Sequence, residues 1–315
     1  MSNKLISVVT PAHNEEKNLT VFCNKVKEIF SQSKILNKYD FEIIMTDDGS
    51  TDGTWDEIVT LGKKDKRYKG IHLSRNFGHQ IALTAGLDKA QGNLVIYCDS
   101  DLQHPPRIFP KLVKKWEQGF KVVHTNRLKT AGEPALKKFL SNKFYKAINK
   151  MSTTKIMPGM ADFKLIDKKV LFALKEMREK DRFLRGMVPW LGFKSTVINF
   201  KADKRLHGVP SYNFKKNLFF ARTAILSFST KPLEIIGYIG FLLMLFSAFV
   251  LFLGLSFSLL RWKLFFSPIF FVALLNTFLM GLVLLCMGII ALYVSNIKTE
   301  VMNRPTYLIA EESNL

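Results

Sequence analysis

The chain has 315 residues, of which 46 are lysine or arginine and 26 are aspartate or glutamate, so its formal net charge at pH 7 is +20. Its 3 cysteines show neither disulfide nor metal-ligand spacing, which excludes a disulfide scaffold and a zinc module built on cysteine. A basic chain that is 48% apolar points to nucleic acid or anionic lipid as a partner.

Apolar runs of strand length alternate with amphipathic segments along the first 126 residues. This alternation predicts a mostly parallel sheet that is covered by helices on both faces. The expected strands are 5–10, 41–47, 69–74, 94–99 and 121–126, and the expected helices are 15–30, 54–65, 79–90 and 106–118.

The first two expected strands end in polar, acidic turns. Asn14 and Glu15 follow the first strand, and Asp47 and Asp48 stand at the end of the second. A carboxylate in such a turn accepts hydrogen bonds from a base or a ribose, so we predict that Asp48 contacts a nucleotide, with helix capping as the alternative. Asp52 fits either role equally well. Because parallel strands end at one edge of a sheet, these turns are expected to form one floor.

The fourth expected strand runs into Asp99 and Asp101. Residues i and i+2 of an extended segment project to the same side, so both carboxylates face one ligand site beyond the strand. Oxygen ligands favour Mg²⁺ or Mn²⁺, and open α/β sheets bind ligands at this edge. We therefore predict a metal site on Asp99 and Asp101, with Gln103 as a further contact. The alternative is a solvated acidic turn that caps the helix after Pro105.

Two later segments have the pattern of helices that lie flat on a membrane surface. Glu133–Met151 carries large apolar residues at helical spacing and lysines over much of the remaining circumference, and Asn217–Ser229 is rich in leucine, isoleucine and phenylalanine. The alternative for Glu133–Met151 is an ordinary helix that packs its apolar stripe on the domain. We expect both segments to hold the ligand edge of the sheet at a lipid boundary.

Two apolar blocks near the C-terminus are long enough to cross a bilayer, which takes about 20 residues. Leu233–Leu260 contains Glu234 as its one charged residue, and Phe265–Val294 contains none. The short segment between them, Arg261–Lys263, predicts a hairpin of two transmembrane helices. Basic residues outside the hairpin place the N-terminal domain and both termini in the cytoplasm, at the inner membrane of the cell. Anionic membrane lipid is therefore the expected partner, and nucleic acid is not.

These features predict three parts of the chain. Residues 1–214 are the expected cytoplasmic domain, 215–231 a juxtamembrane interfacial helix, and 232–315 a two-helix transmembrane region with a short cytoplasmic tail. Met1–Glu16 lacks the basic and apolar regions of a signal peptide. Glycines in the first span permit close helix contacts, and we expect a homo-oligomer.

The ordered segments together resemble the inverting family 2 glycosyltransferases with a GT-A fold. Within them the chain is most similar to the polyprenyl-phosphate sugar transferases related to dolichol-phosphate mannose synthase and bactoprenol glucosyltransferase. The resemblance covers nearly the whole chain. Besides the turns above, it includes Ser74–Gln80, Asn126–Arg127, Asp162–Phe163, Arg182–Gly186, Arg205 and Phe228–Leu233. One departure is Gly208–Tyr212, which lacks the lysine of the family's Gly-x-Ser-Lys-Tyr pattern and contains a proline instead.

The resemblance implies transfer of a hexose from a nucleotide diphosphate sugar, expected to be linked to uridine, onto a polyprenyl phosphate such as undecaprenyl phosphate. The product would be a lipid-linked sugar donor for modification of a cell-envelope glycan. A Mg²⁺ or Mn²⁺ ion would neutralise the charge that develops on the leaving diphosphate. The residues implied for nucleotide-sugar binding are Pro11, Asn14, Glu15, Asp48, Asp99 and Ser100, and those implied for the metal are Asp99, Asp101 and Gln103.

Asp101 and Asp162 are the residues implied for catalysis. Asp162 would act as a base or as a positioning group, and the alternative is a helix cap. Four arginines are expected to hold the acceptor phosphate, because a guanidinium binds phosphate oxygens bidentately. The alternative for each is a contact with lipid head groups. They are Arg127, Arg182, Arg185 and Arg205.

Other classes of protein fit the sequence less well. A processive polysaccharide synthase would carry a Gln-x-x-Arg-Trp motif and more spans, whereas Arg261–Trp262 lacks the glutamine and lies between the spans. A nucleic-acid-binding protein would show a basic and aromatic reader module, which is missing here. A non-catalytic membrane scaffold that retains a nucleotide site is the remaining alternative. The presence of Asp99, Asp101 and Asp162 favours the enzyme.

Overall fold

A computed structural model describes residues 4–128, 160–177, 179–180, 182–203 and 268–315, with scattered positions between 236 and 253. The chain divides into two compact units, Met1–Ala224 with Pro305–Leu315, and Ile225–Arg304. Both predicted interfacial segments lie outside the described residues, as does much of the first predicted span.

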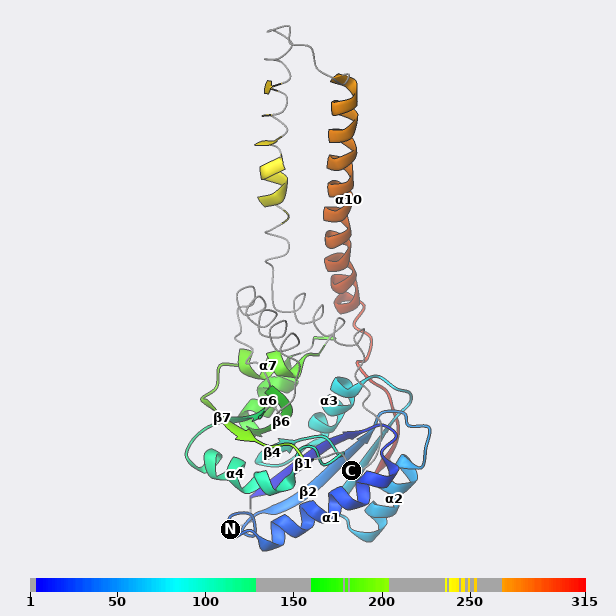
Figure 1. Ribbon diagram of the computed structural model, residues 1–315. Coiled ribbons are helices and arrows are strands. Elements are labelled where there is room, and N and C mark those ends of the chain that lie inside the picture. The colour runs from blue at the N-terminus through cyan, green and yellow to red at the C-terminus, as the bar shows by residue number, and fades with distance from the viewer. Residues whose placement is uncertain are drawn as a thin grey trace. The chain divides into compact units, whose positions relative to one another are not determined.

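The first unit is built on one mixed sheet (Figure 1). Its strands are β1 (Leu5–Ala12), β2 (Asp40–Asp47), β3 (Tyr68–Leu73), β4 (Leu94–Tyr97), β5 (Val122–Arg127), β6 (Met160–Asp167), β7 (Ser195–Phe200) and β8 (Ile309–Ser313). They lie in the order β7-β5-β6-β4-β1-β2-β3-β8. The pairs β1–β2, β1–β4, β2–β3 and β5–β7 are parallel, whereas β6 runs antiparallel to β4 and β5, and β8 runs antiparallel to β3. The predicted mostly parallel sheet is confirmed.

Helices cover both faces of this sheet, as predicted. They are α1 (Glu16–Gln32), α2 (Thr54–Lys64), α3 (His79–Lys89), the 3₁₀ turn η1 (Pro106–Ile108), α4 (Phe109–Glu117), α6 (Lys168–Glu176) and α7 (Leu184–Trp190). In Figure 1, α1, α2 and α4 lie on one face and α3, α6 and α7 on the other. The first face holds the main core, where α1 buries Leu19, Phe22, Val26 and Phe30 at helical spacing.

The central strands are apolar on both faces because helices cover both. All of β4 is buried, so Leu94–Tyr97 reads as a continuous apolar run. In β6 the alternation of side chains separates two environments: Phe163 and Leu165 lie in the main core, while Asp162 and Lys164 take the other face. One face of β6 can therefore present polar side chains to a site while the other face packs in the core.

The last helix, α10 (Pro268–Val301), belongs to the second unit. Within the described part of the chain it is the one helix whose length and composition suit a membrane span, over Phe271–Val301, where an 18-residue window has a mean hydropathy of 2.5. The predicted hairpin of two spans is not shown, because the first span is described only at scattered positions. The segment expected to be a short cytoplasmic tail forms β8 at one edge of the sheet.

Candidate active site

The carboxyl ends of β1, β2, β3 and β4 meet at one edge of the sheet, because these strands are parallel. Antiparallel β6 begins at this edge, which brings Asp162 to it. The turns that follow the parallel strands carry most of the predicted site residues. Sheet topology therefore gathers side chains from five separate segments of the sequence.

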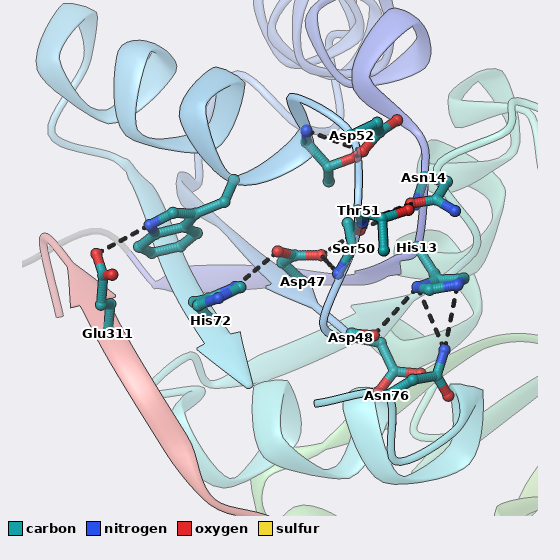
Figure 2. A network of polar contacts seen from close by, with 12 residues as sticks. His13, Asn14, Asp47, Asp48, Ser50, Thr51, Asp52, His72, Asn76 and Glu311 are labelled. Carbon is teal, nitrogen blue, oxygen red and sulfur yellow. Dashed lines mark hydrogen bonds and ion pairs between the residues drawn. The ribbon is translucent and has the colours of Figure 1, made fainter. Parts of the chain in front are cut away.

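The turns after β1 and β2 are tied to each other (Figure 2). Asn14 has a left-handed φ of 56°, and its amide N–H donates to Ser50 Oγ at 2.9 Å. In return the N–H of Thr51 donates to Asn14 Oδ1 at 2.9 Å. The N–H of Glu15 donates to Thr54 Oγ1, also at 2.9 Å. Asn14 and Glu15, both predicted to bind the donor, are thus held in one rigid pair of turns.

Asp48 holds the loop that follows β3. Its carboxylate accepts the N–H of Phe77 at 2.7 Å and that of Gly78 at 2.9 Å. Gly78 has a φ of +100°, which favours glycine. Burial raises the pKa of Asp48, although the two N–H groups oppose the rise. His13 Nδ1 lies 3.1 Å from the Asp48 carbonyl oxygen, and Asn76 Nδ2 lies 3.2 Å from His13 Nε2 (Figure 2).

Three other donor-side residues have defined local roles. The carboxylate of Asp52 accepts the N–H of Thr54, the first residue of α2, at 3.0 Å. Ser100 is 2% exposed, and its hydroxyl donates to the carbonyl oxygen of Pro11 at 3.5 Å. The turn after β4 therefore touches the last residues of β1.

Asp99 is ionised and reachable from solvent. His79 Nε2 donates to Asp99 Oδ1 at 2.7 Å, and the Asp99 N–H donates to His104 Nδ1 at 3.1 Å. Burial acts to raise the pKa of Asp99, but the imidazoles of His104 and His79 outweigh it and hold the pKa well below its usual range. Burial opposes protonation of His79, yet the Asp99 carboxylate raises the pKa of His79 to about 8. The Asp99 side chain is 35% exposed.

Asp101 is more deeply placed, at 8% exposed, and its Oδ1 accepts the N–H of Gln103 at 3.0 Å. Leu102 between them has a φ of 62°, an uncommon conformation for a residue with a side chain. Gln103 Oε1 accepts from Arg127 Nη1 at 3.3 Å. The residues predicted for the metal thus lie beside one predicted for the acceptor phosphate.

Within the described ranges, no three histidine, cysteine or acidic side chains gather around one point that could hold a metal ion. The predicted set has two carboxylates and one amide oxygen. Such a partial set of oxygen ligands fits Mg²⁺ or Mn²⁺, since these ions usually keep water and bind substrate phosphates in their remaining positions. The ionised state of Asp99 agrees with this reading.

Asp162 forms a buried ion pair. Its side chain is 4% exposed, and Arg185 donates to it through Nε at 2.9 Å and approaches it through Nη2 at 2.8 Å. Gln80 Nε2 also donates to Asp162 Oδ2, at 3.0 Å, while Gln80 Oε1 accepts the N–H of Leu184 at 3.1 Å. Burial acts to raise the pKa of Asp162, but the Arg185 guanidinium outweighs it and the net pKa is lowered.

The predicted acceptor arginines occupy different positions. Arg127 is exposed at the end of β5. Arg185 pairs with Asp162. Arg182 donates through Nη2 to the carbonyl oxygens of Leu174 and Met177, at 2.7 and 2.9 Å. This nitrogen therefore satisfies carbonyl groups at the C-terminal end of α6. Arg205 lies outside the described residues.

Sequence reasoning assigned no site role to His79 or Gln80. The structure places the His79 imidazole on the Asp99 carboxylate. The family resemblance includes Ser74–Gln80, so it could have pointed to His79 and Gln80. It assigned no chemical role to this segment. His104 packs its ring on that of Phe163, with 5.2 Å between the ring centroids.

Comparison with known proteins identifies the family of the chain. Residues 7–173 match the family described as Glycosyl transferase family 2. The chain is 38% identical over 307 residues to an uncharacterised glycosyltransferase of Synechocystis, covering 97% of this chain and 95% of the relative. It is 35% identical over 309 residues to the bactoprenol glucosyl transferase of Shigella phage SfII, covering 96% and 97%.

A crystal structure of glucosyl-3-phosphoglycerate synthase from Mycobacterium tuberculosis is similar with a TM-score of 0.45 and 18% identity, over 71% of this chain and 78% of that one. The family assignment does not depend on this likeness. It follows from a family match over more than half of the chain and from relatives that align with nearly all of it. The chain is therefore a transferase enzyme that belongs to glycosyltransferase family 2.

Proposed function

We propose that the protein transfers a hexose from a nucleotide diphosphate sugar to a polyprenyl phosphate. The observation that carries the proposal is the 35% identity to a bactoprenol glucosyl transferase over 96% of this chain, a coverage that extends beyond the sheet into the C-terminal apolar helix. A donor that is soluble and an acceptor that is a lipid require a site at the membrane surface. The basic net charge of +20 suits such a surface.

The donor would bind over the turns that follow β1, β2 and β4. Asp99, Asp101 and Gln103 would hold a Mg²⁺ or Mn²⁺ ion, which supplies neutralisation of the charge on the leaving diphosphate. The lowered pKa of Asp99 keeps its carboxylate ionised at neutral pH without any ligand. We take a uridine diphosphate hexose as the first donor to test.

Arg127 and Arg185 would hold the acceptor phosphate. Arg127 is exposed and touches Gln103, so a phosphate bound there stands next to the donor diphosphate. A phosphate monoester has a second pKa of about 6 and is largely ionised at pH 7, so its attack on the sugar needs no strong base. The lowered pKa of Asp162 makes it a weak base. We therefore assign Asp162 the role of positioning Arg185, and we expect a single displacement that inverts the anomeric carbon.

The membrane arrangement is part of the proposal. Helix α10 would be the second span of the predicted hairpin, with the sheet domain and both termini on the cytoplasmic side of the inner membrane. The interfacial segments 133–151 and 217–229 would lie on anionic lipid. In this arrangement the acceptor head group reaches the site without leaving the bilayer.

A panel of nucleotide sugars tests the proposal. Purified protein in liposomes containing undecaprenyl phosphate, with Mg²⁺ or Mn²⁺, should move a labelled sugar from one donor into the organic phase. The product should release its sugar in mild acid and carry the β configuration when the donor is α-linked. Asp99→Asn serves as the inactive control.

Two outcomes would count against the proposal in different ways. If no donor labels the lipid while the protein still binds a nucleotide, the polyprenyl phosphate acceptor is wrong. If the label moves instead to a water-soluble acceptor, the family activity stands and the lipid assignment falls.

A further inference from the structure

The C-terminal strand contacts the donor side of the site. β8 lies against β3 at the edge of the sheet, with Glu311 opposite His72. Trp55, at the start of α2, donates its indole N–H to Glu311 Oε2 at 3.0 Å (Figure 2). These residues are 256 positions apart in the sequence. The last residues of the chain are thus built into the domain that carries the predicted nucleotide floor.

A series of contacts leads from Trp55 to the turn after β2. The Trp55 ring stacks on His72 with 5.1 Å between centroids and 26° between planes. His72 Nδ1 donates to Asp47 Oδ2 at 2.7 Å, and Asp47 is fully buried. The other Asp47 oxygen accepts the N–H of Ser50 at 3.1 Å. Ser50 in turn accepts the N–H of Asn14 at 2.9 Å, so the series ends at a predicted donor-binding residue (Figure 2).

A second contact joins the same C-terminal segment to the loop after β3. The N–H of Ser74 donates to the carbonyl oxygen of Leu308 at 2.9 Å. This loop supplies the N–H groups of Phe77 and Gly78 to Asp48. The two loops also touch directly, because a Cβ at Gly49 would collide with the backbone of Arg75. Movement of either loop is therefore coupled to the other and to the C-terminal segment.

We propose that residues 305–315 form a strap that positions the two donor-side loops, residues 47–54 and 74–80, and that Trp55 and Glu311 are positioning residues for donor binding. The identity of the donor rests on the proposed function. The strap itself depends only on contacts within the chain. Residues 310–312 of β8 are exposed, so the strap adds little apolar burial to the core. Its loss should weaken nucleotide binding more than it weakens folding.

Neighbouring Glu312 provides a matched control. Successive strand residues point to opposite faces, and Glu312 pairs with Lys89 at the end of α3, at 2.7 Å, away from the Trp55 series. Glu311→Ala and Glu312→Ala remove the same chemical group from the same strand. The expected loss of donor affinity belongs to Glu311 alone.

The experiment measures binding of uridine diphosphate with Mg²⁺ by titration calorimetry, and the KM for the nucleotide sugar and for the polyprenyl phosphate. Glu311→Ala should weaken nucleotide binding and raise the donor KM about three- to tenfold, with the acceptor KM unchanged. Glu311→Gln keeps an acceptor for the indole N–H and should restore most of the affinity. Trp55→Phe keeps the ring stack but loses the donor, and should resemble Glu311→Ala.

A stop codon after Arg304 removes the whole strap and should cause a larger loss of nucleotide affinity than Glu311→Ala. Because this truncated chain can fail to fold, the point variants decide the matter. Wild-type nucleotide affinity in folded Glu311→Ala and Trp55→Phe, or an equal loss in Glu312→Ala, would overturn the strap while the proposed function stands. A wild-type protein that binds no nucleotide would overturn the proposed function and the strap together.

Discussion

Replacing Arg185 with methionine should leave Asp162 as a buried carboxylate without its counter-charge. The Asp162 side chain is 4% exposed and that of Arg185 32% exposed. Breaking a buried ion pair costs about 3–5 kcal/mol, and the partial exposure of Arg185 places the loss near the lower limit, at about 3 kcal/mol. For a domain of this size, that loss lowers the melting temperature by roughly 6–12 °C.

A double-mutant cycle separates the ion pair from the packing of the two side chains. Asp162→Asn with Arg185→Met removes both charges of the pair, so the double variant should regain at least about 1 kcal/mol relative to Arg185→Met. Arg107→Met is the matched control. Its guanidinium pairs with Asp203, but the two side chains are 55% and 41% exposed, so the loss there should stay below about 1 kcal/mol.

Thermal unfolding of the full-length protein in detergent, followed by tryptophan fluorescence at one scan rate, measures the cycle. Arg185→Met should also raise the KM for polyprenyl phosphate. If Arg185→Met melts with the wild type, or if the losses of the two single variants simply add, Asp162 and Arg185 are not coupled. Asp162 would then be free to act as a base, and its assignment as a positioning residue would be wrong.

Three further predictions follow from single groups. Asp99→Asn and Asp101→Asn should each abolish transfer while the protein stays folded and membrane-bound, and full activity of either variant in excess chelator would remove the metal from the proposal. Burial lowers the pKa of Lys164 from 10.5 to about 8, so the folded state binds this proton less tightly than the unfolded chain does. The free energy of unfolding should therefore rise by about 3 kcal/mol between pH 8 and pH 10.5, a rise that Lys164→Met should lack; parallel pH curves would contradict this. In a Cys286→Ser background, a cysteine at Ser267 should react with an impermeant thiol reagent from outside, and one at Ser313 only in opened membranes; the reverse pattern would refute the cytoplasmic assignment.

Local periodicity was enough to predict the first five strands and the helices between them. The strand predicted at 41–47 is Asp40–Asp47, and the helix predicted at 54–65 is Thr54–Lys64. The fourth strand was expected to reach residue 99 but ends at Tyr97. The reason is a side chain: the N–H of Asp99 donates to His104 instead of to a neighbouring strand.

The later strands could not be read from an apolar pattern. β6 carries Asp162 and Lys164 on a face that is buried. Its sequence alone resembles that of a strand with one exposed face, because the Arg185 guanidinium that pairs with Asp162 lies elsewhere in the sequence. β8 is polar because it lies at the sheet edge, and Ile309–Ser313 reads as a solvated tail. Both strands are specified by partners that are distant in the sequence.

The candidate site divides in the same way. Asp99 and Asp101 were predicted because the strand that presents them is adjacent in the sequence. The contact of His79 with Asp99 spans 20 residues, and that of Gln80 with Asp162 spans 82. Neither distance follows from periodicity or spacing, since each depends on how the strands are ordered in the sheet. The described structure supplies that order and, with it, the charge pairs of the site.

His104 joins the packing of the core to the geometry of the candidate metal turn. Its ring is 7% exposed, stacks on Phe163 and meets the edge of Phe200 at 5.8 Å, so its position is set by aromatic packing. Its Nδ1 accepts the N–H of Asp99. A change in volume at Phe163 or Phe200 would therefore move His104 and turn the backbone of Asp99 with it. Core packing and the position of Asp99, a predicted metal ligand, are therefore coupled, because the His104 imidazole takes part in both.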